Sequence, residues 1–435
     1  MNARSAVDPV VRWRAAFDRA PANDAAFASR RAEAFERFAG LGFPGARDED
    51  WKYTSLRRLA GREFAPVARE QALAATPPAA PSFGPHRAVL VNGYLHEAAS
   101  GLDGCPAGLR LRSLGRHGRD TDSASWLQIP AGGGTERFAA LNAALCGDAL
   151  LLEAASTVTT DTVMHLQVDA LGDETSVSHP RVLVRLAAGA GLKLVVHYRG
   201  DDRAERFVNA VIDIQAGERS ELQIYRLQQQ GARSFQIERI EAALAREARL
   251  VVRDASLGAS LARLDLRARL EGSGASAELT GLFLADDARH LDTQPRIQHA
   301  AVGTTSLQDY RGIAAGRGRG VINSKVVVDQ GAQKSVSRQT SRNLLLGAGA
   351  EIDTKPELEI GADDVKCNHG ATTGQLDPVA LFYLRSRGLD ERSARNALTR
   401  AFAGAVFSRM DLEPFARAVH AAFDARLDRL LTEAT

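Results

Sequence analysis

Between residues 189 and 336 one pattern recurs: a turn signal followed by a short run of β-forming residues. The turn signals are Gly189-Ala190-Gly191, Gly217-Glu218, Ala245-Arg246, Gly272-Ser273-Gly274, Gly303-Thr304 and Gly331-Ala332. They are spaced by about 28 residues, which lies in the range that indicates stacked structural repeats. The pattern therefore predicts that successive segments of the chain fold alike and cover one another.

Each period also holds a second run in which apolar and polar residues alternate, as in residues 208–214 and 262–270. Alternation is typical of a strand with one buried face and one wet face. Two short strands per period, joined by tight turns, predict a mainly β chain whose core is a β-solenoid. The alternative is an ordinary β-sandwich in which the regular spacing is a coincidence.

The two ends of a solenoid expose strand edges, which must be capped or paired to prevent aggregation. Helical patterns flank the repeat on both sides, and we expect them to act as the caps. On the N-terminal side the helical pattern covers residues 9–40, with Asn23-Asp24 as a helix start. Residues 65–85 resemble a linker, 87–94 a strand, 101–134 loops, and 138–145 a short helix.

On the C-terminal side three helices are predicted after Gly374. The first begins at Asp377-Pro378, and the second begins near Asp390. The third carries an apolar stripe that includes Phe415, Val419 and Phe423. Either these stripes pack on one another, or part of the apolar surface is kept for a partner.

These patterns divide the chain into four parts. They are an N-terminal helical domain (1–64), a linker and mixed connecting segment (65–155), a β-helix core (156–370) and a C-terminal helical domain (375–435). The net charge is +2, from 55 Lys and Arg against 53 Asp and Glu, which gives no electrostatic reason to expect nucleic acid or a membrane as partner.

Targeting and disulfide signals are both missing from the sequence. The three cysteines form no Cys-x-x-Cys pair, and no stretch reaches the about 18 uninterrupted apolar residues of a membrane-spanning helix. The first residues contain no apolar export segment. We therefore expect a cytoplasmic protein whose thiols stay reduced and available to metals.

Cys367 and His369 are the candidate metal ligands. If their segment is a strand, residues two apart project from the same face. Thiolate and imidazole are good ligands for zinc or iron, but two ligands do not complete a site. The alternative is a buried cysteine that packs as a small apolar residue beside a hydrogen-bonded histidine.

Other motifs point less clearly to chemistry. No phosphate-binding Walker sequence is present, and residues 316–320 are better explained as a turn. His290 and His299 are expected to be surface histidines. The acidic residues before Cys367 suggest a β-solenoid carbohydrate-active enzyme, although their alternation fits a plain wet face better. They are Glu351, Asp353, Glu357, Glu359, Asp363 and Asp364.

Several segments together resemble the SufB/SufD family of iron–sulfur cluster assembly proteins. They are residues 47–54, 343–347, 353–360, 362–372 and 381–388. The first segment, and the cysteine-bearing motif that contains Cys367, are more similar to the SufD branch than to the SufB branch. The resemblance covers nearly the whole chain.

The resemblance implies a non-enzymatic scaffold with a right-handed parallel β-helix between helical domains. It implies pairing with SufB through the end of the β-helix, and a transient iron–sulfur cluster at that interface. ATP is expected on a partner ATPase, SufC, which binds the C-terminal helices. A reduced flavin in the complex and a homodimer of the isolated chain are both compatible with the resemblance.

The same resemblance implies roles for particular residues. Cys367 and His369 correspond to the family's cluster-site cysteine and histidine, with SufB supplying the missing ligands. Phe382, Tyr383, Arg385 and Arg387, near the end of the first C-terminal helix, are expected to contact SufC. A purely structural interaction module remains the third alternative.

Overall fold

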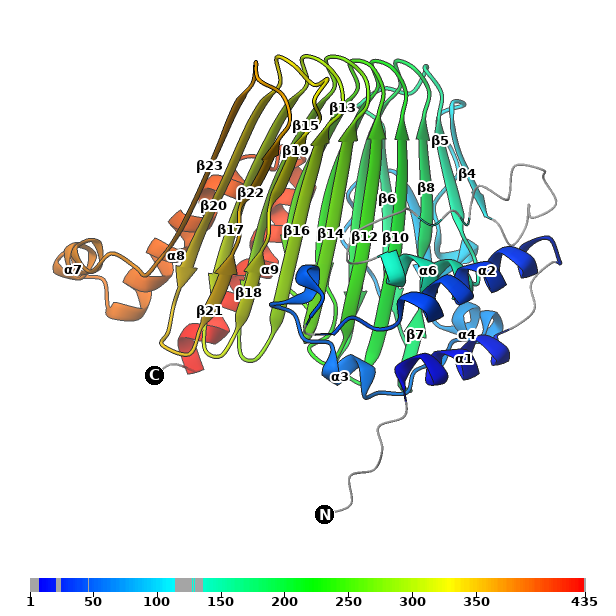
Figure 1. Ribbon diagram of the computed structural model, residues 1–435. Coiled ribbons are helices and arrows are strands. Elements are labelled where there is room, and N and C mark those ends of the chain that lie inside the picture. Colours follow the sequence, from blue (N-terminus) through cyan, green and yellow to red (C-terminus); the bar gives the residue numbers. More distant parts are fainter. Residues whose placement is uncertain are drawn as a thin grey trace.

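The computed structural model describes residues 8–20, 25–45, 47–113, 127, 129 and 136–433. In this part of the chain, two mainly parallel sheets form a β-solenoid of about eight turns, with helices before and after it (Figure 1). The predicted mainly β solenoid fold is confirmed. The β-sandwich alternative is wrong, because neighbouring strands of the solenoid are parallel and lie one coil apart in sequence.

One sheet contains ten strands within the described residues, in the order β23-β20-β17-β15-β13-β11-β9-β6-β2-β3. The bounds are β2 His86–Val91, β3 Tyr94–Leu95, β6 Val163–Ala170, β9 Gly191–Gly200, β11 Glu221–Gln229, β13 Arg249–Ser256, β15 Ser276–Ala285, β17 Thr305–Ala314, β20 Val336–Leu345 and β23 Lys366–Gly374. These strands include every β-forming run that follows a predicted turn signal.

The other sheet contains thirteen strands within the same described ranges. The bounds are β1 Ala65–Pro66, β4 Leu109–Ser113, β5 Leu150–Ala154, β7 Ser176–Ser178, β8 Arg181–Leu186, β10 Arg206–Ala216, β12 Phe235–Leu244, β14 Leu261–Leu270, β16 His290–His299, β18 Arg319–Ile322, β19 Lys325–Val328, β21 Glu351–Thr354 and β22 Glu357–Ile360. The expectation that residues 101–134 form only loops is wrong at β4, which pairs antiparallel with β5.

The space between the two sheets holds an apolar cluster that runs through the early and middle coils, and a buried ion network of Arg226, Glu238 and Asp254. Leu194, Ile224, Val252 and Leu279 occupy the same position in four successive coils. Burying one such side chain is worth about 1.5–3 kcal/mol, so columns of this kind contribute strongly to the stability of the stack.

The N-terminal helices cover the outer face of the thirteen-stranded sheet (Figure 1). They are α1 Pro9–Arg19, α2 Ala25–Leu41, η1 Glu49–Trp51, α3 Arg57–Ala60 and α6 Glu136–Leu145. Two short helices, α4 Arg69–Ala74 and η2 Glu97–Ala99, instead contact β3 and β2 of the ten-stranded sheet. Phe35 and Phe38 of α2 belong to the same buried cluster as Phe207 and Phe235 of the sheet. The predicted helix start at Asn23-Asp24 lies outside the described residues.

The C-terminal helices α7 Pro378–Ser386, α8 Glu391–Phe407 and α9 Glu413–Glu433 follow β23. The predicted starts are confirmed, since Asp377 and Asp390 accept hydrogen bonds from the backbone of the first turns of α7 and α8. The apolar stripe of α9, including Phe415, packs on Tyr225 and Leu227 of the ten-stranded sheet. The stripes therefore cover a sheet face as well as one another.

Helices do not cap the solenoid as we expected. At the N-terminal end the sheets finish with β3 and β4, which pair antiparallel with β2 and β5. At the C-terminal end β21, β22 and β23 are the last strands, and no described strand pairs with their outer edges. The amphipathic helices pack on the sheet faces because those faces, unlike the strand edges, offer a broad apolar surface.

No helix in the described ranges combines the length and apolar character that crossing a bilayer requires.

Candidate functional site

Strand β23, at the open end of the solenoid, carries Cys367 and His369. Its register places Cys367 beside Ser337 and His369 beside Gln339. Ser337 and Gln339 are 1% and 2% exposed and face the space between the sheets. Partners in register project to the same side of a sheet, so Cys367 and His369 lie on the inner wall of the last coil. The prediction that they share one face is confirmed.

The two side chains differ in exposure. Cys367 is half-buried against the solenoid core, whereas His369 is exposed because no further coil covers it. Burial raises the pKa of the Cys367 thiol, and a hydrogen bond from the backbone of Ser337 opposes that effect. Cys367 therefore keeps its proton near neutral pH while the open end is uncovered.

The inner wall below these residues changes from apolar to polar. The column that ends at Cys367 contains Leu250 and Ala277, and then Ser306 and Ser337. The column that ends at His369 changes in the same way, from Leu279 to Gln308 and Gln339. A polar wall is costly in a dry core but suits a surface that meets water or another protein.

A chain of hydrogen bonds leads from the interior to this wall. His299 is fully buried, and its Nδ1 and Nε2 lie 2.7 and 2.8 Å from the hydroxyls of Thr304 and Ser306. Ser306 donates to Ser337 at 2.9 Å, directly below Cys367. Burial lowers the pKa of His299 to about 4, so its imidazole is neutral near pH 7.

The expectation of two surface histidines is wrong. His299 points inward, and His290, at the opposite end of β16, is half-buried on the outer face beside Thr54. Side chains alternate between the two faces of a strand. Residues 290 and 299 are nine positions apart, an odd number, so their side chains lie on opposite faces.

Within the described residues, no group of three or more His, Cys, Asp or Glu side chains is placed to hold a metal ion. The acidic residues before Cys367 do not approach it as ligands or as a catalytic pair. Asp353 pairs with Arg319 at 2.8 Å, Glu357 with Lys355 at 3.2 Å, and Glu359 with Lys325. These ion pairs lie on the outer face of the solenoid, which disfavours the alternative of a carbohydrate-active enzyme.

Helix α7 extends away from the body of the molecule beside the open end (Figure 1). None of its residues is buried, and Val379, Phe382 and Tyr383 are 72%, 74% and 55% exposed. Arg387 lies 5.2 Å from the ring centroid of Tyr383, and Arg385 pairs loosely with Glu391 at 3.6 Å. The predicted partner-binding residues therefore sit on an exposed apolar and cationic surface, whose role stays a prediction.

Residues 48–54 form a clip, a structural feature that the sequence pattern did not reveal. Trp51 is buried, with the guanidinium of Arg263 4.0 Å from its ring centroid. Asp50 pairs with Arg296, and Thr54 donates to Asp292 at 2.6 Å. The clip fastens the N-terminal helices to strands β14 and β16. Only the clustering of acidic and aromatic residues hinted at such contacts.

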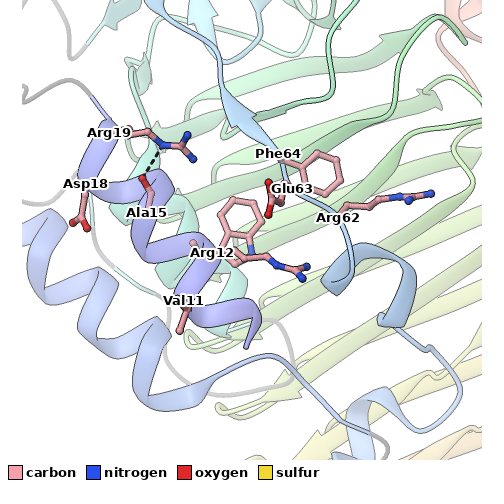
Figure 2. Close-up of a pocket in the computed structure, with 9 residues that line it drawn as sticks. Val11, Arg12, Ala15, Asp18, Arg19, Arg62, Glu63 and Phe64 are labelled. Atoms are coloured by element: carbon pink, nitrogen blue, oxygen red, sulfur yellow. Dashed lines mark hydrogen bonds between the residues drawn. The ribbon is translucent and has the colours of Figure 1, made fainter. Parts of the chain in front are cut away.

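A hollow between α1 and residues 62–64 has a volume of about 550 Å³ (Figure 2). Two of its cationic side chains are already engaged, since Arg12 donates to the carbonyl of Ala60 and Arg62 pairs with Glu205 at 2.8 Å. Trp13 and Phe64 stack at its base, 6.4 Å apart. We assign no chemistry to it.

Two family models match this chain. The core domain of SufBD, described as belonging to the SUF system of FeS cluster assembly, matches residues 169–402, more than half of the chain. The N-terminal region of SufBD proteins matches residues 20–166.

Curated relatives agree with these matches. An iron–sulfur cluster assembly SufBD family protein of Synechocystis is 30% identical over 405 residues, which are 89% of this chain and 88% of the relative. The Escherichia coli iron–sulfur cluster assembly protein SufD is 29% identical over 366 residues, 83% and 84% of the two chains. The chloroplastic protein ABCI7 of Arabidopsis thaliana is 30% identical over 235 residues, 54% and 50% of the two chains.

Proposed function

This chain belongs to the SufBD family of iron–sulfur cluster assembly proteins, and we propose that it acts there as a non-enzymatic, SufD-type scaffold subunit. The observation that carries the proposal is the open end of the solenoid. There, unpaired strand edges surround a thiol and an imidazole that lack further ligands in the described part of the chain.

The open end pairs with the corresponding end of SufB, and the cluster is built between the two chains. Strand edges β21, β22 and β23 offer backbone donors and acceptors to a second solenoid. Cys367 contributes a thiolate and His369 a neutral imidazole to the nascent cluster, which is the cargo of the complex. SufB contributes the remaining ligands, so neither chain holds a complete site alone.

The C-terminal helices dock the ATPase SufC, which binds and hydrolyses ATP in place of this chain. Phe382 and Tyr383 supply the apolar contact, and Arg385 and Arg387 the charged rim. Large apolar side chains that are more than half exposed on one short helix support this assignment, because they cost free energy until a partner covers them. The complex works in the cytoplasm, where thiols remain reduced.

Co-expression with SufB and SufC, followed by anaerobic purification, tests the proposal. We expect a brown complex that contains iron and sulfide and absorbs broadly near roughly 400 nm. His369→Ala should lower the iron content of the complex at least fivefold while all subunits still co-purify.

His96→Ala provides the matched control, since His96 follows β3 at the opposite end of the same sheet. Its complex should contain the wild-type amount of iron. A His369→Ala complex with full iron content, or the failure of SufB to bind this chain, would contradict the proposal.

A further inference from the structure

A second surface, unrelated to the open end, has the character of a ligand site. A groove with a volume of about 660 Å³ lies between residues 43–60 and the thirteen-stranded sheet. It runs past the first residues of four neighbouring strands: Phe235 of β12, Leu261 of β14, His290 of β16 and Arg319 of β18. Its volume lies within the about 300–1,000 Å³ that is usual for small-molecule sites.

The rim of this cationic groove carries Lys52, Arg57, Arg58 and Arg319, and none of the described residues that line it is acidic. Arg319 is neutralised by Asp353 at 2.8 Å. In contrast, the ion pairs found among the described residues include none made by Lys52, Arg57 or Arg58, all of which are exposed. The pKa of the Glu49 carboxyl is lowered by Lys355 and also by the charge of Lys52, so Lys52 has a carboxylate nearby. Among the described residues, Arg57 and Arg58 are therefore the groove cations without a carboxylate partner, which favours an anionic ligand.

The base of the groove is apolar. Phe235 and Leu261 are 1% and 6% exposed, and Tyr53 is half-buried. The cations already lie near aromatic rings, since Lys52 is 5.4 Å from the ring centroid of Tyr53 and Arg58 is 5.7 Å from that of Phe235. An apolar base next to guanidinium groups suits a planar ring attached to a phosphate.

The wall of the groove is held in place before any ligand arrives. The single hydroxyl proton of Thr54 goes to Asp292, so the 2.9 Å contact between Thr54 and His290 requires that His290 Nε2 donates. Burial lowers the pKa of His290, so the ring is neutral near pH 7 and its Nδ1 is an acceptor. A fixed wall lowers the entropy that binding costs.

We propose that the cationic groove binds a small molecule that carries both a phosphate group and a planar ring, as in a nucleoside phosphate. The phosphate pairs with Arg57 and Arg58, and the ring lies on the apolar base beside Tyr53. The guanidinium groups of arginine match phosphate oxygens in paired hydrogen bonds, so these two residues carry most of the affinity. The site is independent of the proposed cluster assembly role.

Titration calorimetry on the full chain tests the proposal with ADP, GDP and FMN, which differ in ring size, and with pyrophosphate and adenosine alone. At least one of the three ring phosphates should bind and raise the melting temperature. Pyrophosphate and adenosine should each bind at least tenfold more weakly than that ligand, because each lacks half of the recognised chemistry.

The double variant Arg57→Gln/Arg58→Gln should lose at least tenfold in affinity. The control Arg338→Gln/Arg342→Gln removes two exposed arginines from β20 of the other sheet and should bind as the wild type does. Circular dichroism and ligand-free melting temperatures establish that both variants fold.

Three outcomes would overturn the proposal. The first is that none of the ring phosphates binds. The second is that the Arg57 and Arg58 substitutions leave binding unchanged. The third is that pyrophosphate binds as tightly as the best ring phosphate, which would make the groove a simple anion site.

Discussion

His369 lies in register with Gln339, so its imidazole belongs to the inner wall of the solenoid although no further coil covers it. Gln339 on β20 is 2% exposed, whereas His369 on the neighbouring strand β23 is exposed. A second solenoid stacked on β23 would make His369 as buried as Gln339 is now. The proposed pairing with SufB would bury His369 in this way.

The exposed surface of α7 leads to the first prediction. Phe382→Ala/Tyr383→Ala should reduce co-purification of SufC at least tenfold and leave the melting temperature of the isolated chain nearly unchanged, because both side chains are more than half exposed. Val11→Ala, which truncates another apolar side chain that is 58% exposed, is the control. Undiminished binding of SufC to the double variant would contradict the docking assignment.

The clip leads to a prediction about stability. Arg263 and Asp292 form an ion pair at 2.6 Å, with both side chains fully buried. Arg263→Ala leaves Asp292 without that partner and removes the contact with Trp51, and should lower the free energy of unfolding by about 3–5 kcal/mol. Arg417→Ala breaks an exposed pair with Glu413 and should cost less than about 1 kcal/mol. Similar losses for both variants in urea denaturation would refute the structural role of the clip.

Buried histidines make stability depend on pH. Burial lowers the pKa of His165 and His179 to about 3, and of His197 and His299 to about 4. In the unfolded chain these histidines become protonated near pH 6.5, whereas in the folded chain they become protonated only at lower pH. Stability should therefore be independent of these groups above about pH 6.5 and fall as the pH drops towards 4. Denaturation midpoints measured from pH 8 to pH 4.5 check this, and a flat profile would contradict it.

A substitution of His165 tests the effect of a single buried histidine on stability. Both of its ring nitrogens are buried without a hydrogen-bond partner, and its ring lies 4.7 Å from that of Phe83. His165→Phe should raise the free energy of unfolding by about 1 kcal/mol at pH 7 and flatten its decline in acid, because an unsatisfied polar group is removed. His299→Phe is the matched contrast. It should destabilise the chain, since Thr304 and Ser306 would each lose one hydrogen bond. A loss of stability in His165→Phe would contradict this explanation.

The sequence revealed those parts of the fold that depend on local patterns. Turn signals and alternation predict the solenoid because each coil repeats the same local conformations, and Asp377 and Asp390 predict helix starts because capping is local. The placement of the helices was not predictable in this way. An apolar stripe such as that of α9 indicates that one face is buried, but not whether it covers a sheet face or a strand edge.

The same distinction between local patterns and contacts across the fold applies to the candidate site. The shared face of Cys367 and His369 follows from their spacing within one strand. The polar columns beneath them do not, because Ser306, Ser337 and Cys367 become neighbours only through the register between coils. The clip likewise joins residues more than two hundred positions apart, such as Thr54 and Asp292.

The accessibility of Cys367 tests the central claim most directly. Alkylation of each cysteine with iodoacetamide, followed by mass spectrometry, compares the isolated chain, at a concentration where sedimentation shows a monomer, with the chain bound to SufB. Cys105 is half-buried against the solenoid core, and Cys146 is buried, so they serve as an unchanged and an unreactive reference. We expect the rate at Cys367 to fall at least tenfold in the complex while the rate at Cys105 stays the same. An unchanged rate at Cys367 in a stable complex would show that the open end of the solenoid is not the interface.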